Sequence, residues 1–341
     1  MSFDDGFMMG LMLGNEGGGG GGDDDDWTPP EFPEPGAYQI TILIDLYLSE
    51  KRNSGLSGNK TITLTLTDKN NMWATSGESR IDWGDGTITS FVSGYSLSYS
   101  HEYKKAERYV ITVTGKENEN YIYFSSTYGK DAILGIKFGS KMGINGIFYN
   151  MNDILYVKFC GETFSTDGLY FGDLYTLTKV EFAGGYPHDG DFRTNCFRGC
   201  RSLKKADFTK KLSVFPNTMF SECFSLKEVD TSSAVTFEGS VFSNCYNLKE
   251  INAPLLENMN GGSNIQNCYI LRKFSAPKLK EISAEILSCY SISEIDTPSL
   301  ISAGPQSFYC CYNLQKLICA EGCDFNGNPF FTCPQLYPRP Q

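Results

Sequence analysis

The stretch "NCYNLKEINAP", residues 244–254, recurs along the second half of the chain. "ECFSLKEVDT" precedes it by about 22 residues, and "NCYILRKFSAP", "SCYSISEIDTP" and "CCYNLQKLICA" follow it. Each copy joins a cysteine, an aromatic residue and a leucine-type residue to a short apolar strand. A period of about 20–29 residues is typical of repeat proteins that stack coil upon coil. The repeat therefore predicts a solenoid, which offers surface for binding rather than a cluster of catalytic groups.

Ten copies align on the leucine-type position of the repeat. Their spacing is 21 to 23 residues, apart from one interval of 26 between Leu177 and Leu203. The early copies depart from the pattern, because their cysteine position holds Met151 and Leu174. We expect about ten coils over residues 125–341, centred on Ile133, Ile154, Leu177, Leu203, Leu226, Leu248, Leu271, Ile292, Leu314 and Leu336.

Seven cysteines each stand three residues before the leucine-type position. Equivalent residues of successive coils stack about 4.7–4.9 Å apart, as neighbouring parallel strands do. We therefore expect one buried column of structural thiols, which behave as small hydrophobes. A straight column does not give the four converging ligands of zinc, and disulfides are disfavoured by the odd number and the parallel Cβ directions. These ladder cysteines are Cys200, Cys223, Cys245, Cys268, Cys289, Cys311 and Cys333.

Residues 37–116 carry the alternation of half-buried β-strands. "ITILIDLYL" and "TITLTLT" alternate apolar and polar residues with a period of two. "RIDWGDGTITS" then breaks a strand with a tight turn, in which Asp82 and Asp85 can accept backbone hydrogen bonds. We interpret this turn as structural, with a calcium site as the alternative.

Two parts of the chain resemble known families. The unit "VFSNCYNLKEINAP", residues 241–254, matches A-F-x-x-C-x-x-L-x-x-I-x-x-P and resembles BspA-like leucine-rich repeats, which are common in bacterial and phage-encoded surface proteins. The W-G-D-G-T turn, with His101 and Tyr103, resembles the PKD family of immunoglobulin-like domains, which serve as spacers or adhesion modules. Together they imply a mainly β chain: a PKD/Ig-like β-sandwich over 37–116, a linker over 117–124 and a leucine-rich-repeat solenoid over 125–341.

Residues 1–36 indicate an apolar docking peptide followed by a Gly/Asp/Pro tether. Glycines recur every four residues among Met and Leu, so a helix here would show a smooth edge suited to close packing on a partner. A start without function is the alternative. Two acids precede this apolar run and no A-x-A-like site follows it, which disfavours a signal peptide. The candidate docking residues are Phe7, Met8, Met9, Leu11, Met12 and Leu13.

Composition excludes several classes of function. The net charge is −11, but residues 1–34 hold nine acids and no base, which leaves about −2 on the remainder. No basic stripe is therefore present for nucleic acid, and no run approaches the roughly 18–20 apolar residues that cross a membrane. Only two histidines occur, His101 and His188, and no H-E-x-x-H, G-x-S-x-G or P-loop motif is found. We expect no enzyme, no metal and no cofactor.

Two further columns along the repeats are candidate binding surfaces. The residue after the ladder cysteine is aromatic in five successive copies, which suits glycans or proteins, although rings that merely cover the coil edges are the alternative. Mixed charges follow the strand face, consistent with a solvated sheet or with a selective polar surface. The candidate binding residues are Phe224, Tyr246, Tyr269, Tyr290 and Tyr312 of the aromatic stripe, and Glu228, Glu250, Lys273 and Glu294 of the strand face.

This layout predicts a non-enzymatic recognition protein that attaches at one end and binds at the other. The first hypothesis is a phage virion component, a tail fibre or capsid accessory protein made in the host cytoplasm. It would bind a bacterial surface glycan or protein and dock on a virion structural protein through residues 1–13; a homo-oligomer is compatible with this layout. The alternatives are a BspA-like adhesin on the bacterial cell surface and, less favoured, a glycan-active enzyme.

Overall fold

The computed structural model describes residues 31–46, 60–67, 79–90, 97–115, 121–122, 132–140, 143–144, 148, 151, 153–161, 168–182, 190, 192–208 and 212–336. The chain divides into two units, Met1–Pro30 and Glu31–Gln341. The first unit lies outside the described residues. The docking peptide expected at Phe7 to Leu13 therefore lies outside them, and so does His188, which belongs to the second unit.

A seven-stranded mixed sheet joins the first β segment to the first repeats. Its strand order is β11-β10-β8-β1-β6-β3-β4. β1 pairs antiparallel with β6 on one side and with β8 on the other, whereas β8, β10 and β11 run parallel. Hydrogen bonding is thus continuous across the boundary expected near residue 120. The strands are β1 (Gln39–Asp45), β3 (Arg80–Asp82), β4 (Ile88–Ser90), β6 (Arg108–Thr114), β8 (Ile133–Phe138), β10 (Tyr156–Phe159) and β11 (Lys179–Phe182).

A second sheet has the order β5-β2-β7-β9. Its strands are β2 (Thr61–Thr67), β5 (Leu97–Glu102), β7 (Tyr121–Ile122) and β9 (Gly143–Ile144). Ile62, Leu64 and Leu66 of β2 are buried in the same hydrophobic cluster as the isoleucines of β1, as their alternation predicts. β7 lies inside the expected linker 117–124 and pairs with both β2 and β9. The PKD/Ig-like assignment of this region stays a prediction.

The W-G-D-G-T turn is held by its own hydrogen bonds. Asp82 Oδ1 accepts the Gly84 N–H at 3.0 Å, and Asp85 Oδ1 accepts the Thr87 N–H at 3.0 Å. Asp85 Oδ2 lies 2.8 Å from His101 Nε2. These contacts engage the carboxylates within the turn, and no group of three His, Cys, Asp or Glu side chains is placed to hold a metal in the part of the chain that is described. These hydrogen bonds are consistent with the structural interpretation of the turn, which stays a prediction.

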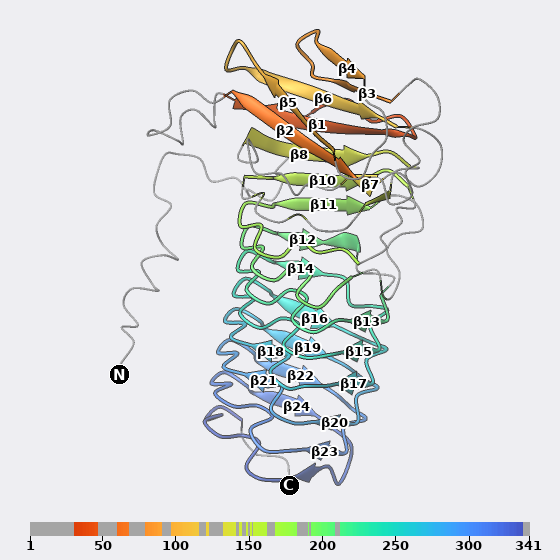
Figure 1. The fold of residues 1–341 in the computed structure, drawn as a ribbon. Coiled ribbons are helices and arrows are strands. Elements are labelled where there is room, and N and C mark those ends of the chain that lie inside the picture. Colours follow the sequence, from red (N-terminus) through yellow and green to blue (C-terminus); the bar gives the residue numbers. More distant parts are fainter. Residues whose placement is uncertain are drawn as a thin grey trace. The chain divides into compact units, whose positions relative to one another are not determined.

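From β12 onward the chain forms stacked turns whose strands lie in parallel ladders (Figure 1). The first ladder face contains β12 (Lys205–Ala206), β14 (Glu228–Val229), β16 (Glu250–Asn252), β19 (Lys273–Ser275), β22 (Glu294–Asp296) and β24 (Lys316–Ile318). The second contains β13 (Val214–Phe215), β15 (Thr236–Phe237), β17 (Asn258–Met259), β20 (Glu281–Ile282), β23 (Ser302–Ala303) and β25 (Asp324–Phe325). A short third pair is β18 (Ile265–Gln266) with β21 (Ile286–Leu287).

The solenoid has about seven turns, so the expectation of ten coils is corrected. The seven copies from Leu203 to Leu336 are those that carry a ladder cysteine. The three earlier copies supply β8, β10 and β11, which extend the seven-stranded sheet instead. The physical reason is the antiparallel pairing of β1 with β8, which ties these copies into a mixed sheet.

Each ladder cysteine is buried and donates its thiol to the turn before it. Cys223 Sγ lies 3.1 Å from the carbonyl of Phe197, and Cys245 Sγ lies 3.1 Å from that of Phe220. The acceptor is always the residue three places before the cysteine position of the preceding turn. The same contact is made by Cys200, Cys268, Cys289, Cys311 and Cys333.

Burial also keeps three of these thiols in the donor form. It raises the pKa of Cys223, Cys245 and Cys268, so the proton that each donates is retained at neutral pH. Packing alone accounts for a small apolar residue at this position. The hydrogen bond explains why the residue is cysteine rather than alanine.

Residues 31–36, the end of the expected tether, lie on the seven-stranded sheet. Phe32 is buried and its carbonyl accepts a hydrogen bond from Lys137 Nζ at 2.6 Å. Glu34 forms ion pairs with Lys137 at 2.9 Å and with Lys158 at 3.0 Å. Burial by itself raises the pKa of Glu34, but the hydrogen bonds from these two lysines lower it to about 2. The chain is therefore anchored here before β1 begins.

Replacing Glu34 with glutamine should loosen this anchor at neutral pH. The folded pKa of about 2 lies below the ordinary 4.5, so the contribution of the carboxylate is present above pH 4.5 and is lost as the pH falls toward 2. We expect faster proteolysis after residue 30 in E34Q than in the wild type at pH 6. The matched control is E31Q, because Glu31 is exposed and makes no ion pair with the described residues. Equal cleavage of the two variants would contradict the anchor.

Cys245→Ala should lower the free energy of unfolding by about 1–3 kcal/mol, because it removes the sulfur from a packed column and a donor from the Phe220 carbonyl. The matched control is Cys319→Ala, since Cys319 is half-buried and lies outside the column. Urea unfolding of both variants measures the difference. A control that loses as much stability as Cys245→Ala would show that the column has no special role.

Candidate functional site

The five stripe residues form one continuous stack of rings, named here the aromatic column. Consecutive ring centroids are 4.7, 4.9, 5.1 and 5.1 Å apart, with interplanar angles of 9°, 6°, 14° and 23°. This separation is close to the spacing of neighbouring strands, so the rings follow the repeat of the turns. The members, in chain order, are Phe224, Tyr246, Tyr269, Tyr290 and Tyr312.

The column continues beyond the residues expected from the sequence. The guanidinium of Arg201 lies 4.7 Å from the ring centre of Tyr175 and 5.3 Å from that of Phe224. Arg201 thus takes the place of a ring and contacts both neighbours through cation–π interactions. Both added residues stand at the same repeat position, directly after Leu174 and Cys200. The repeat position alone places Arg201 in line with the rings, although a search for aromatic residues does not find it.

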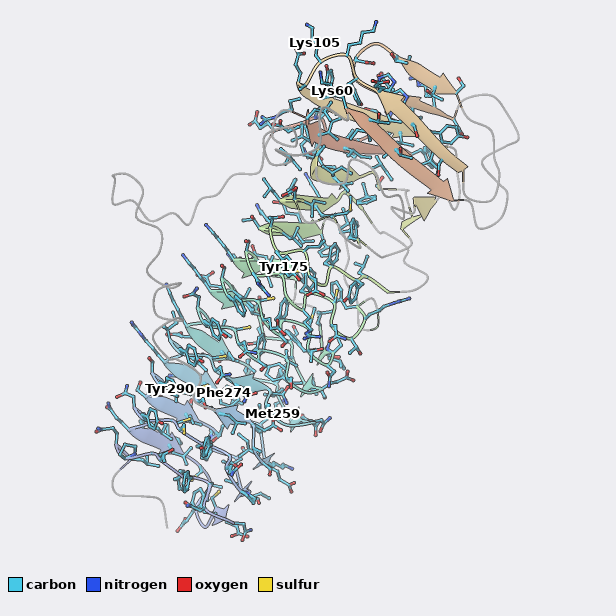
Figure 2. The ribbon with its side chains drawn as sticks, turned by 60° about the vertical axis from the view of Figure 1, so that its left-hand side comes forward. Lys60, Lys105, Tyr175, Met259, Phe274 and Tyr290 are labelled. Atoms are coloured by element: carbon cyan, nitrogen blue, oxygen red, sulfur yellow. The ribbon has the colours of Figure 1, made fainter. Side chains whose placement is uncertain are left out.

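Stacking decides which parts of the rings a partner can reach. The face of an inner ring is covered by the next ring, so edges and hydroxyl groups are what remain. Tyr290 and Tyr312 are 43% and 45% exposed, whereas Phe224, Tyr246 and Tyr269 are half-buried. Figure 2 labels Tyr175 and Tyr290, which come from the first and a late turn of the column. A sugar ring could stack only at an end of the column, but hydroxyls can hydrogen-bond along it.

The phenol groups of Tyr246 and Tyr312 stay protonated at neutral pH. Burial raises the pKa of Tyr246. The pKa of Tyr312 is raised to about 12 by its hydrogen bond to Cys310, whose sulfur lies 3.5 Å from the hydroxyl. Neutral phenols both donate and accept hydrogen bonds. These two tyrosines therefore present polar groups of adaptable direction rather than charge.

The strand face carries charges that are largely paired with one another. Glu294 lies between Lys273 and Lys316, at 3.2 and 3.6 Å, and Lys205 lies 3.6 Å from Glu228. The hydrogen bond from Lys273 lowers the pKa of Glu294. Exposed ion pairs of this kind contribute little to stability. The face is a neutralised polar surface, and Glu250 stands in register with Lys273 on the adjacent strand.

Reactive groups are not gathered at either surface. The ladder cysteines are buried, and burial raises the pKa of Cys223, Cys245 and Cys268, so these three thiols are poor nucleophiles at neutral pH. His101 is engaged with Asp85 in the turn. Across the described ranges no helix is long and apolar enough to cross a membrane.

Comparison with known proteins gives a family. The model of the BspA type leucine rich repeat region matches residues 145–268 and 261–337, in six copies. No curated protein matches the chain.

Several solved structures are similar at low identity. A Treponema pallidum leucine-rich repeat protein is 14% identical, with a TM-score of 0.34, covering 60% of this chain and 84% of that one. A leucine rich cell surface protein of Faecalibacterium prausnitzii is 15% identical, with a TM-score of 0.32 and coverage of 66% and 76%. A Bacteroides ovatus leucine-rich repeat protein is 15% identical, with a TM-score of 0.32 and coverage of 69% and 71%. The family match spans more than half of the chain, which therefore belongs to the BspA-type leucine-rich repeat proteins.

Proposed function

We propose that this protein is a non-enzymatic recognition protein of the bacterial cell surface, which adheres to a surface glycan or protein through the aromatic column. Its membership of the BspA-type repeat family supports a surface role. The observation that carries the proposal is the column itself, in which five successive turns place five rings in one line.

Stacked rings suit this task for an energetic reason. Binding is weakened when flexible side chains of the binding surface have to become ordered. The rings of the column are already ordered by stacking on their neighbours, so this cost is smaller. Tyrosine also combines apolar edge area with a hydroxyl, which suits both protein and glycan partners. Along the line of the column, several weak contacts to one large partner can add up.

The virion-associated role expected from the sequence has no support from the family, which favours the cell-surface alternative. Docking of residues 1–13 on a partner remains a proposal, as does a PKD-like spacer over residues 37–116. A glycan-active enzyme is the third candidate, and no described arrangement of side chains favours it.

Stacking should make an inner ring matter more for stability than the last one. Tyr269→Ala removes stacking contacts with two rings and should lower the free energy of unfolding by about 1–3 kcal/mol, whereas Tyr312→Ala removes contact with one ring and should lower it less. Urea unfolding at pH 7 checks the order. Equal losses would mean that ring stacking does not stabilise the column.

The double variant Tyr269→Ala plus Tyr290→Ala should bind bacterial cells at least tenfold more weakly while remaining folded by circular dichroism. The matched control is Tyr309→Ala plus Phe331→Ala, a stacked pair at 5.6 Å outside the column. We expect the control to lose no more than twofold. Unchanged binding by the folded column variant, or an equal loss in the control, would reject the column as the binding site.

A second control separates the two surfaces. Lys273→Gln plus Glu294→Gln removes the ion pairs of Glu294 with Lys273 and with Lys316 from the strand face without changing the net charge. We expect cell binding to persist. A loss confined to this variant would move the binding site to the strand face.

A further inference from the structure

Two consecutive turns of the solenoid depart from the common spacing between the second-face strand and the ladder cysteine. The cysteine follows the first strand residue by nine positions in the turns of β13, β15, β23 and β25. The interval is ten from Asn258 to Cys268 and eight from Glu281 to Cys289. A turn with one extra residue is thus followed directly by a turn with one residue fewer. The two strands concerned, β17 and β20, belong to different ladders.

The ladder is intact on either side of this place. At the step from β20 to β23, the N–H groups of Ile301 and Ser302 donate to the Lys280 carbonyl at 2.9 and 3.2 Å, and the Gly304 N–H donates to the Ile282 carbonyl at 2.8 Å. The steps from β13 to β15 and from β15 to β17 repeat this pattern of three donors and two acceptors.

At the step from β17 to β20 the same backbone groups form none of these bonds with any described residue. The spacing change accounts for this, because a shift in register moves donors away from their acceptors. One wall of the open step consequently presents hydrogen-bond donors, and the other presents acceptors. The donors are the N–H groups of Lys280, Glu281 and Ser283, and the acceptors are the carbonyls of Glu257 and Met259.

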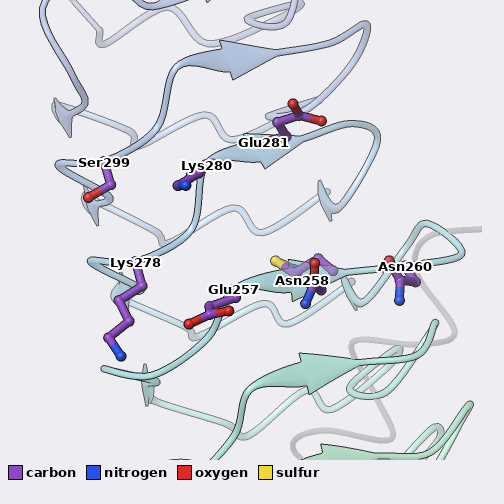
Figure 3. A pocket seen from close by; sticks show the side chains of 8 residues that line it. Glu257, Asn258, Asn260, Lys278, Lys280, Glu281 and Ser299 are labelled. Carbon is purple, nitrogen blue, oxygen red and sulfur yellow. The ribbon is translucent and has the colours of Figure 1, made fainter.

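A pocket of about 690 Å³ lies at the open step (Figure 3). Four charged side chains line it, and none forms an ion pair or hydrogen bond within the described chain, in contrast to the paired charges of the strand face. Two are positive and two negative, so their charges balance. They are Glu257, Lys278, Lys280 and Glu281.

We infer that this pocket binds a neutral sugar residue of a surface glycan. A ligand here has to accept hydrogen bonds from one wall and donate them to the other, and hydroxyl groups do both. The balanced charges favour a neutral ligand, and the amides of Asn258 and Asn260 add further donors and acceptors. Met259 is the one apolar side chain among the lining residues, which disfavours an apolar ligand. The volume lies within the roughly 300–1,000 Å³ of small-molecule sites.

Distance argues against a peptide strand as the occupant. A strand inserted between two others needs about 9.6 Å between them, twice the usual spacing. β17 and β20 still have Cα atoms within 8 Å of one another. A single hydroxyl group that accepts a hydrogen bond from one wall and donates one to the other needs less width than a strand. The inference rests on the proposed recognition function, for which it names a ligand class and a contact site separate from the aromatic column.

Titration of the isotope-labelled full chain tests the pocket directly. The probes are glucose, galactose, mannose, N-acetylglucosamine and N-acetylgalactosamine, with trialanine as the peptide probe. We expect at least one sugar to shift the amide resonances of Lys280, Glu281 and Ser283 saturably, while trialanine does not. The amides of Ile301 and Ser302, at the intact next step, should stay unchanged.

A matched pair of variants locates the binding. Asn258→Ala plus Asn260→Ala should weaken the sugar at least tenfold. Thr236→Ala plus Glu238→Ala changes the same places one turn earlier, where the step is intact, and should weaken it no more than twofold. The inference is overturned if no sugar shifts these amides, if trialanine alone shifts them, or if both pairs lose equally.

The two proposals fail in different ways. Cells that are still bound through the aromatic column while no sugar shifts the pocket amides overturn the pocket alone. Sugar binding retained in a chain whose Tyr269 and Tyr290 variants adhere normally overturns the column alone.

Discussion

The spacing of about 4.7–4.9 Å between neighbouring strands is the constraint on which the solenoid depends. One step of the chain brings a thiol within 3.1–3.2 Å of the carbonyl below it, as at Cys223 and Cys268. The same step places rings about 5 Å apart, as for Tyr269 and Tyr290. Buried and exposed columns therefore have one cause, and a change in either disturbs the other through the shared backbone.

The columns could be predicted because residues one sequence period apart occupy equivalent positions in successive turns and therefore stack on one another. Cys245 and Tyr246 are adjacent in the chain. Because the cysteine recurs in a buried column, the residue that follows it must recur in a second column beside the first. Arg201 shares that position, but its stacking between Tyr175 and Phe224 depends on chemistry that the repeat pattern does not encode. Repetition predicts where a residue lies, and contact energies decide what it does there.

Contacts between distant residues were the part that could not be predicted. Glu34 pairs with Lys137, 103 positions away, and no local pattern relates them. The antiparallel pairing of β1 with β8 is equally non-local, and it converts three expected coils into sheet strands. The uneven spacing around Asn258 and Glu281 was visible in the sequence, but its consequence appears only when backbone partners are traced. The repeat period alone predicts more regular coils than the structure has, because it carries no information about which strands pair.

Regular stacking and its interruption have opposite effects on what a partner can reach. Where the turns stack evenly, each ring stacks on the next ring and strand charges pair with opposite charges. A partner then reaches ring edges and neutralised ion pairs. Where one residue is gained and the next turn loses one, backbone groups and unpaired charges face a pocket. Hydrogen-bonding groups left without partners in a concave site bind more selectively than those already paired, since a ligand lacking the complementary group leaves them unsatisfied. A solenoid can therefore place an adhesive surface along its evenly stacked turns and a ligand-selective site at an irregular step between two turns.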